Sequence, residues 1–354
     1  MMPLLLLWAA GCEPSDPPDS SAPSVIDTAD DTASDTGGHT GEDSGEETGD
    51  DTSDDTSEDS GEDTAPVPPT AVALTVGSTH NCVLMSDGSV ECWGYAHTGQ
   101  DEPPPGVVFE SVDAGLWHTC GVTDAGELVC FGCEGNDVGQ CPAPTGQWQS
   151  VSAGVYHTCG VAADGTLACW GCEGHDAGQC SPPEGQYTRV SAGENQSCAI
   201  RDDGVAVCWG CETTMPPPDG QCDAPTDTSF TEISAMSAIS CGLTTENELQ
   251  CWGRDTFGEA SPPAGVHSDF DVGMVHGCAV SATGAVDCWG CGNGEITGDP
   301  NLGQCEAPGG TGWTMVGAGT GHSCALAADG SVDCWGCGTG WTFDGGQCED
   351  RAAP

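Results

Sequence analysis

Cysteine is the residue whose number and spacing offer the most chemistry in this sequence. The chain has 354 residues and 25 cysteines. Pairs of cysteines at a fixed spacing can form disulfides, bind zinc or exchange thiols. Seven pairs share a spacing of ten residues: Cys82 and Cys92, Cys120 and Cys130, Cys159 and Cys169, Cys198 and Cys208, Cys241 and Cys251, Cys278 and Cys288, and Cys324 and Cys334.

A second set of cysteines follows five of these pairs. Where the earlier position is Tyr95 or Arg254 instead, the later cysteine is missing too, so the two positions vary together. Joint loss predicts bonded partners. The set is Cys133 and Cys141, Cys172 and Cys180, Cys211 and Cys222, Cys291 and Cys305, and Cys337 and Cys348. Five Cys-x-x-Cys copies with so many further thiols favour a disulfide framework over the alternative of a redox or zinc site.

Short hairpins must position the ten-residue pairs. Around Cys159, the segments HTCGVAA and TLACWG resemble strands joined by Ala163, Asp164 and Gly165. A three-residue hairpin loop needs a left-handed third residue, and every unit supplies Gly or, once, Asn247. This register places Cys159 directly opposite Cys169, at a distance that a disulfide accepts. We therefore predict a cross-strand bond in each unit and a staple at the neck of five variable loops.

The units recur seven times, and their first cysteines are 37 to 46 residues apart. Each unit offers a strand before an Ala-Gly turn, the hairpin pair, and a short fourth segment after Gly-Gln-Cys. We predict an all-β fold: a seven-bladed β-propeller with four short antiparallel strands per blade. Prolines after Gly-Gln-Cys suit an outer edge strand, where a missing N–H does no harm.

The frame A-G-x-x-H-T-C-x-V-x-x-D-G-x-L-x-C-W-G resembles the regulator-of-chromosome-condensation repeat in its compact bacterial form. It recurs over most of the chain after residue 71. The resemblance implies a seven-bladed propeller but no single function, because repeats of this kind occur in exchange factors, enzyme inhibitors and surface proteins. The chromatin-linked exchange role is not expected of an acidic, exported chain. Gln196 and Ile239 replace the repeat histidine, and Met236 replaces one turn glycine.

The N-terminal region indicates export. Residues 1–11 are a short apolar run that ends in Ala-Ala-Gly before Cys12, which resembles a bacterial lipoprotein signal with a lipidated cysteine. The alternative is an ordinary secretion signal. Residues 12–70 are rich in acidic, Thr, Ser, Gly and Pro residues without Lys or Arg, so we expect a disordered tether; weak calcium binding or glycosylation there is the alternative. The propeller would occupy residues 71–354, outside the cell membrane in the envelope.

The composition limits the partners. The chain has a formal net charge of −52 and no Lys. Nucleic-acid binding requires a basic face and is excluded as a main role. So many cysteines indicate an oxidising compartment. We expect a monomer with a protein partner, held at the membrane only through its lipid anchor.

The remaining candidate chemistry has a structural explanation. Five histidines recur two residues before the first cysteine, where they could line a metal site, but a repeated polar residue at a strand start more often bonds neighbouring backbone. They are His80, His118, His157, His276 and His322. The tryptophans of Cys-Trp-Gly are expected to pack between blades. No nucleophile motif or phosphate loop is present. We therefore expect no cofactor, no metal and no enzyme activity.

The variable positions between turn glycine and histidine indicate a binding face. Apolar and aromatic residues there, with others in a stapled loop, form our candidate partner-binding set: Leu116, Trp117, Val155, Tyr156, Met274, Val275, Trp341 and Phe343. Packing is the alternative role. The predicted function is a secreted, membrane-anchored, non-enzymatic binding module. The alternatives are a propeller enzyme that cleaves envelope polysaccharide or peptide, and a structural surface-layer component.

Overall fold

A computed structural model describes residues 67–211, 219–291, 303–337 and 345–349. These residues form seven antiparallel sheets, each built from three consecutive strands. We call the sheets blades 1 to 7 in chain order. Their strands are β1 (Ala71–Val76), β2 (His80–Met85) and β3 (Val90–Gly94); β4 (Phe109–Ala114), β5 (Thr119–Thr123) and β6 (Leu128–Phe131); β7 (Trp148–Ala153), β8 (His157–Ala162) and β9 (Leu167–Gly171); β10 (Tyr187–Ala192), β11 (Ser197–Arg201) and β12 (Ala206–Trp209); β13 (Phe230–Met236), β14 (Ile239–Thr244) and β15 (Leu249–Gly253); β16 (His267–Val272), β17 (Gly277–Ser281) and β18 (Val286–Trp289); and β19 (Trp313–Ala318), β20 (Ser323–Ala327) and β21 (Val332–Trp335).

The hairpin between the second and third strands forms as the sequence predicts. In blade 3, Gly165 has a φ of 85° and its N–H donates to the Ala162 carbonyl over 2.9 Å. The Asp164 carboxylate accepts from the Thr166 N–H, which closes the loop. Asn247, the one exception to Gly, takes the same left-handed conformation with a φ of 62°. Consequently Cys159 pairs with Cys169 in the ladder, and the same register recurs in every blade.

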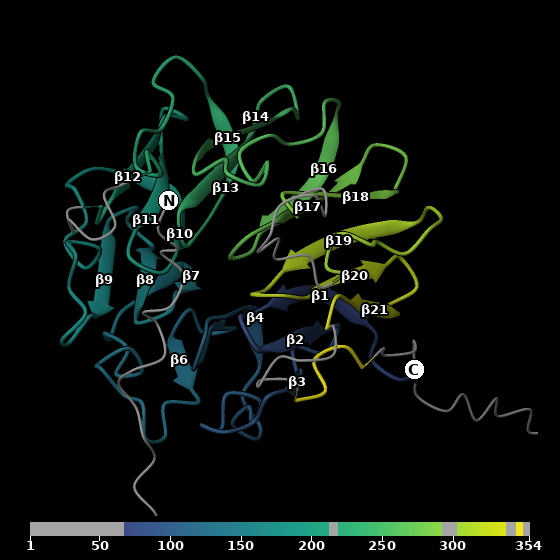
Figure 1. Cartoon of the computed structure of the whole chain (residues 1–354). Coiled ribbons are helices and arrows are strands. Elements are labelled where there is room, and N and C mark those ends of the chain that lie inside the picture. Colours follow the sequence, from purple (N-terminus) through teal and green to yellow (C-terminus); the bar gives the residue numbers. More distant parts are fainter. Residues whose placement is uncertain (1–66, 212–218, 292–302, 338–344, 350–354) are drawn as a thin grey trace, which may run out of the picture. The chain divides into compact units, whose positions relative to one another are not determined.

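The blades are arranged around a common axis, with the first strand of each nearest to it (Figure 1). The ring closes without a shared strand: β1 of blade 1 packs directly against β19 and β20 of blade 7. A hydrogen bond of 2.8 Å between His322 Nε2 and Asn81 Oδ1 joins the same two blades. This arrangement confirms the predicted seven-bladed β-propeller.

The predicted number of strands per blade was wrong. Each sheet has three strands, and among the described residues the segments after Gly-Gln-Cys form no fourth one. They make only isolated bridges, such as Val205 with Ser229 and Glu248 with Val266. The reason is their proline content, exemplified by Pro182 and Pro183, because proline has no N–H to donate to a ladder.

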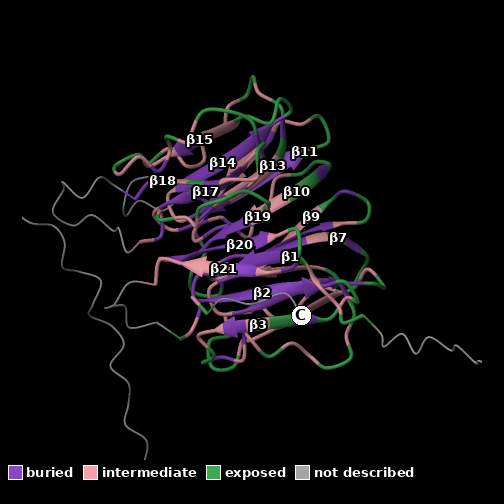
Figure 2. Ribbon diagram, turned by 90° about the vertical axis from the view of Figure 1, so that its right-hand side faces the viewer, coloured by how far each residue is buried: buried purple, intermediate pink, exposed green. Residues whose placement is uncertain are grey.

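The core lies between adjacent blades. Val122 of blade 2 clusters with Trp148 and Val151 of blade 3, and Ile200 of blade 4 clusters with Phe230 of blade 5. The middle strands are the most buried, and β2 and β14 are buried along their whole length (Figure 2). Because each blade buries its faces against two neighbours, the residues at blade interfaces decide how firmly the ring holds together.

Three predicted regions lie outside the described residues: the signal at residues 1–11, the lipidated Cys12, and all but the last few residues of the tether at 12–70. Within the described parts of the chain, no helix is long and apolar enough to cross a membrane.

Candidate functional site

One end of the propeller gathers the turns that carry the predicted binding residues. In an antiparallel three-stranded blade, the turn after the first strand and the loop after the third lie at the same end. We call this end the turn face, and the end with the hairpins the hairpin face. The seven turns are 77–79, 115–118, 154–156, 193–196, 237–238, 273–276 and 319–322.

Hydrogen bonds join neighbouring turns around the axis. The Leu116 N–H donates to the Gly154 carbonyl over 3.2 Å, and the Val155 N–H donates to Gly193 over 3.0 Å. This close approach explains the turn glycine, since a Cβ on Gly154 would lie 2.5 Å from the Gly193 carbonyl oxygen. Met236 breaks the glycine pattern in blade 5. The turn face is thus a continuous backbone collar for most of its circumference.

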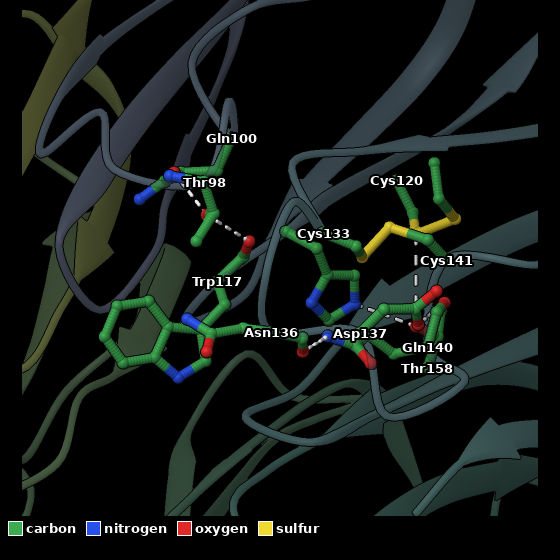
Figure 3. The surroundings of a disulfide bond; sticks show 12 residues. Thr98, Gln100, Trp117, Cys120, Cys133, Asn136, Asp137, Gln140, Cys141 and Thr158 are labelled. Carbon is green, nitrogen blue, oxygen red and sulfur yellow. Dashed lines mark hydrogen bonds between the residues drawn. A yellow bond between two sulfur atoms is a disulfide. The ribbon is translucent and has the colours of Figure 1, made fainter. Parts of the chain in front are cut away.

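The structure brings together all twelve predicted cysteine pairs. The seven cross-strand bonds join Cα atoms 4.0–4.1 Å apart, and the first cysteine of each has no exposed surface. The five staples join Cα atoms 6.0–6.4 Å apart at the necks of connecting loops on the turn face. Figure 3 shows both kinds of bond in blade 2. Each staple holds the two ends of its loop together.

The stapled loops also dock on the next blade through a buried glutamine. Its backbone carbonyl faces the following blade: Gln140 O accepts from the indole of Trp170 over 2.8 Å and from the hydroxyl of Thr158 over 3.1 Å. The Gln140 side chain is buried and folds back onto its own loop, where it bonds Val138 and Asn136. The same indole bond recurs in blades 4, 5, 6 and 7. The tryptophans therefore have the expected packing role, and the recurring Gly-Gln was the unused signal for this contact.

The repeat histidines link neighbouring blades through hydrogen bonds. His118 Nε2 lies 2.8 Å from the Thr158 hydroxyl of the next blade. Because that hydroxyl donates its proton to Gln140, it must accept from His118, which fixes the proton on Nε2. His80, His157 and His276 make the same bond to Thr119, Ser197 and Ser323. His322 makes it to Asn81, which in turn donates to the Gln347 carbonyl.

Burial keeps these rings neutral. Desolvation lowers the pKa of His80, His157 and His276 to about 3, and that of His118 and His322 to about 4. A second proton would sit on Nδ1, which has no hydrogen-bond partner in His80, His118, His157 or His276. The charged form is therefore disfavoured by burial and by the unpartnered Nδ1–H, while the Nε2–H bond to the hydroxyl does not depend on it.

Blades 4 and 5 depart from this pattern. Gln196 reaches the Ile239 carbonyl only at 3.4 Å, and its Oε1 is buried without a partner. Ile239, in the histidine position of blade 5, is fully buried and joins an apolar cluster with Met236 and Phe270. The polar link is therefore longer between blades 4 and 5, and hydrophobic packing replaces it between blades 5 and 6.

Blade 5 also replaces its staple with an ion pair. Arg254 occupies the position of the first stapling cysteine, and its Nε lies 2.8 Å from Glu259 Oε1. Glu259 stands where the stapled loops have glutamine, and its side chain is fully buried. The guanidinium also donates to the Met274 carbonyl over 3.0 Å, and the Phe257 N–H donates to Glu259. The sequence analysis detected that both stapling cysteines are missing from this blade, but it did not predict the ion pair that takes their place.

The predicted partner-binding residues divide into three groups. Leu116, Trp117, Tyr156, Met274 and Val275 are half-buried on the turn face, and Leu116 and Tyr156 also pack against the apolar cluster of Met236 and Ile239. Val155 is a correction: only 3% of it is exposed, because it packs into the cluster that contains Met236 and Ile239. Trp341 and Phe343 lie outside the described residues.

The central channel is a second feature, lined by the first strands of all seven blades around a cavity of about 210 Å³. Oxygen atoms join the blades here: Asp113 accepts from the Ala153 N–H over 2.8 Å, and Asp271 from the Ala318 N–H over 2.9 Å. Burial is the largest influence on both carboxyls, and it raises the pKa of Asp113 and brings that of Asp271 to about 6. Burial, with Glu232 and Asp271 nearby, raises the pKa of Asp269 to about 8.

No cluster of three or more His, Cys, Asp or Glu side chains suited to a metal ion occurs among the described residues. The described residues instead present a set of side chains at one end of the propeller, the turn face.

Comparisons with known proteins identify the class of this fold. The sequence matches the regulator of chromosome condensation (RCC1) repeat at residues 109–140, 148–179 and 315–339. No curated protein matches the chain significantly in sequence. The chain therefore contains RCC1 repeats and folds as a β-propeller.

Solved structures share this fold at low sequence identity. The CRINKLY WD40 ectodomain of the Arabidopsis thaliana receptor kinase ACR4 is 22% identical with a TM-score of 0.60, over 77% of this chain and 100% of that chain. The ectodomain of the Physcomitrella patens receptor kinase CR4 is 22% identical with a TM-score of 0.59, over 77% and 75%. Prp20p of Saccharomyces cerevisiae, described with its binding to Gsp1p and histones, is 16% identical with a TM-score of 0.56, over 71% and 80%.

Proposed function

We propose that this chain is an exported, membrane-anchored, non-enzymatic module that binds a protein partner through the turn face. The observation that carries the proposal is the construction of this face. Five of its loops are stapled by disulfides, and the loops dock on the next blade through backbone carbonyls. Short stapled loops such as 133–141 and 172–180, beside half-buried aromatic side chains, favour binding, because a loop closed by a disulfide loses less conformational entropy on association.

Precedent supports a protein as the partner. Prp20p, a propeller of the same fold, binds Gsp1p and histones, and the two plant propellers are ectodomains of receptor kinases. Twelve disulfides suit an oxidising environment outside the cell membrane. Anchoring through a lipidated Cys12 completes the proposal: Cys12→Ser should release the chain from membranes, and retention of this variant would contradict the anchor. The net charge of −52 opposes self-association, so the module acts as a monomer.

One observation supports an enzyme as the second candidate. Asp269 and Asp271 have raised pKa values at the channel, and a carboxylic acid that holds its proton near neutral pH can act as a general acid. The hydrogen bonds from Val316 and Ala318 to these carboxylates give them a structural role as well. The binding function is favoured, because the channel carboxylates are already used to join blades.

The test is capture followed by measurement. The full chain with intact disulfides is crosslinked to its own envelope and culture medium, and the captured protein is purified for titration. We expect saturable binding that weakens at least tenfold in turn-face variants such as Leu116→Ser with Met274→Ser, and does not change with Asp124→Asn on the hairpin face. Turnover of cell-wall polymers that disappears in Asp269→Asn, without saturable protein binding, would replace the proposal with the enzyme.

A further inference from the structure

Two neighbouring blades carry aromatic side chains at equivalent places on the turn face. Trp117 of blade 2 and Tyr156 of blade 3 each precede the repeat histidine, and both are half-buried. The Tyr156 ring stacks on the exposed ring of His175, with centroids 4.0 Å apart and planes 5° apart. His175 belongs to the stapled loop of blade 3, so a disulfide holds this stack in place.

The equivalent pair in blade 2 is Trp117 with Asn136. In Figure 3 both side chains project away from the disulfides of blade 2. Backbone contacts fix them: the Trp117 carbonyl accepts from the Thr98 hydroxyl over 2.9 Å, and the Asn136 carbonyl accepts from the buried Gln140 side chain. The two blades are joined at this end by the bond from Leu116 to Gly154. The backbone that carries Trp117 and Asn136 is therefore held in position before any ligand arrives.

Carboxylates surround these rings. Glu194, in the turn of blade 4, is close enough to Tyr156 to raise the pKa of its phenol, an effect second to burial. Asp137 is exposed in the blade 2 loop beside His118, and Glu134, Glu173 and Asp176 are exposed in the same two loops. We call Trp117, Tyr156, His175, Asp137 and Glu194 the aromatic–acid surface.

No positive charge balances this surface within the described residues. Arg254 on the turn face is paired with Glu259, Arg201 is paired with Asp203 next to a hairpin, and Arg189 lines the channel. Aromatic faces attract cations through their quadrupole, and unbalanced carboxylates add a longer-range field. Two copies of this chain would each carry a net charge of −52 and would repel one another, so self-association is disfavoured.

We propose that the aromatic–acid surface receives a positively charged segment of a partner protein, whose Lys or Arg side chains lie over the ring of Trp117 and against the exposed side of the stack of Tyr156 and His175. This inference rests on the proposed function, since it names the chemistry and the place of that partner. The carboxylates steer the segment, and the aromatic rings select side chains that combine a cation with an aliphatic stem.

The test reads out Trp117 directly. The full chain is labelled with ¹⁵N-tryptophan, and the Trp117 indole signal is assigned by its loss in Trp117→Phe. Titration with a tetralysine peptide should shift this signal saturably and leave that of Trp313, near the hairpin face, unchanged. A tetraglutamate peptide should shift neither. Because the signal is local, binding of the peptide to the acidic segment before residue 67 does not contribute to it.

Variants define the expected sizes. Tyr156→Ala should weaken the Kd from the Trp117 titration about twofold to fivefold, the range of one exposed cation–π contact. Asp137→Asn with Glu194→Gln should weaken it about fivefold and flatten its salt dependence. Asp124→Asn with Asp202→Asn is the matched control: it removes two exposed charges from the hairpin face and should change the Kd by less than twofold.

Two results would overturn the inference. One is a Trp117 signal that does not shift, or a hairpin-face control that weakens the Kd as much as the turn-face variants do. The peptide would then be attracted by the net charge of the chain alone. The other is a saturable shift with a neutral oligosaccharide and none with tetralysine, which would make the surface a sugar site. A protein partner that is captured but binds Tyr156→Ala as well as the native chain leaves the binding function standing and refutes only this placement.

Discussion

Blade 3 and blade 5 show two ways of building the same sheet. Blade 3 has a stapled loop, a histidine bonded to the next blade and a glycine at its turn. Blade 5 has an ion pair for the staple, Ile239 for the histidine and Met236 for the glycine. The cross-strand disulfide, the hairpin and the indole bond to the loop of the preceding blade are common to both. The hairpin thus defines the fold, while the staple, the histidine bond and the turn glycine can be replaced.

Acid should produce the largest contrast between the two kinds of interface. The folded histidines have pKa values of about 3 to 4, below the unfolded value of 6.5, so the unfolded chain binds more protons between these values. Stability is therefore lost as pH falls below about 6.5, by up to about 1.4 kcal/mol per histidine per pH unit. Thermal melts at pH 7.5 and pH 5 measure this loss.

The control for acid is His157→Gln, which gives blade 3 the residue that blade 4 uses. It should lower stability at pH 7.5 by about 1–2 kcal/mol and reduce the acid sensitivity by roughly one histidine in five. A native chain that melts no lower at pH 5 than at pH 7.5 would contradict the neutral state of the buried histidines.

Removing a cross-strand disulfide should rank second. Cys159→Ala with Cys169→Ala should cost about 3–5 kcal/mol, because it frees the unfolded chain and opens a gap where Cys159 is fully buried. The staple variant Cys172→Ala with Cys180→Ala should cost only about 2–3 kcal/mol, since Cys180 is partly exposed. Chemical denaturation compares the two, and an equal or reversed order would show that the staples carry the fold.

The ion pair of blade 5 should be rescued by the residue that other blades use. Arg254→Ala leaves the buried Glu259 carboxylate uncompensated and should cost about 2–3 kcal/mol, less than a fully buried pair because Arg254 is 27% exposed. Adding Glu259→Gln should recover most of this loss. If the double variant is no more stable than Arg254→Ala, the ion pair does not act as the substitute for a staple.

Alkaline conditions should produce the smallest effect. The folded pKa values of Asp269 and Asp271, about 8 and 6, exceed the unfolded value, so these groups favour folding at low pH and lose that contribution as pH rises through the folded values. Melting temperature should decline slightly from pH 6 to 9. Asp269→Asn should make this decline shallower. If the melting temperature of the variant falls with pH as steeply as that of the native chain, the channel carboxyls do not cause the decline.

Much of the fold was predictable because each unit determines its own hairpin. The left-handed loop residue and the ten-residue spacing gave the register that pairs Cys159 with Cys169. Contacts between units were harder. Nothing within one repeat shows that Val155 packs beside Met236, or that Glu259 faces Arg254, because these contacts depend on how successive blades are placed. The prediction of a fourth strand was wrong because the repeat suggested a strand in a segment whose prolines have no N–H to donate.

The central claim is that seven sheets are each held by their own sulfur bonds and that five are stapled again on the turn face. Non-reducing peptide mapping of the native full chain, with free thiols alkylated first, tests it most directly. We expect Cys172 linked to Cys180 and Cys159 linked to Cys169, with the same pattern in the other blades and no alkylated cysteine in the repeats. Alkylation of the repeat cysteines, or bonds between different blades, would contradict the account.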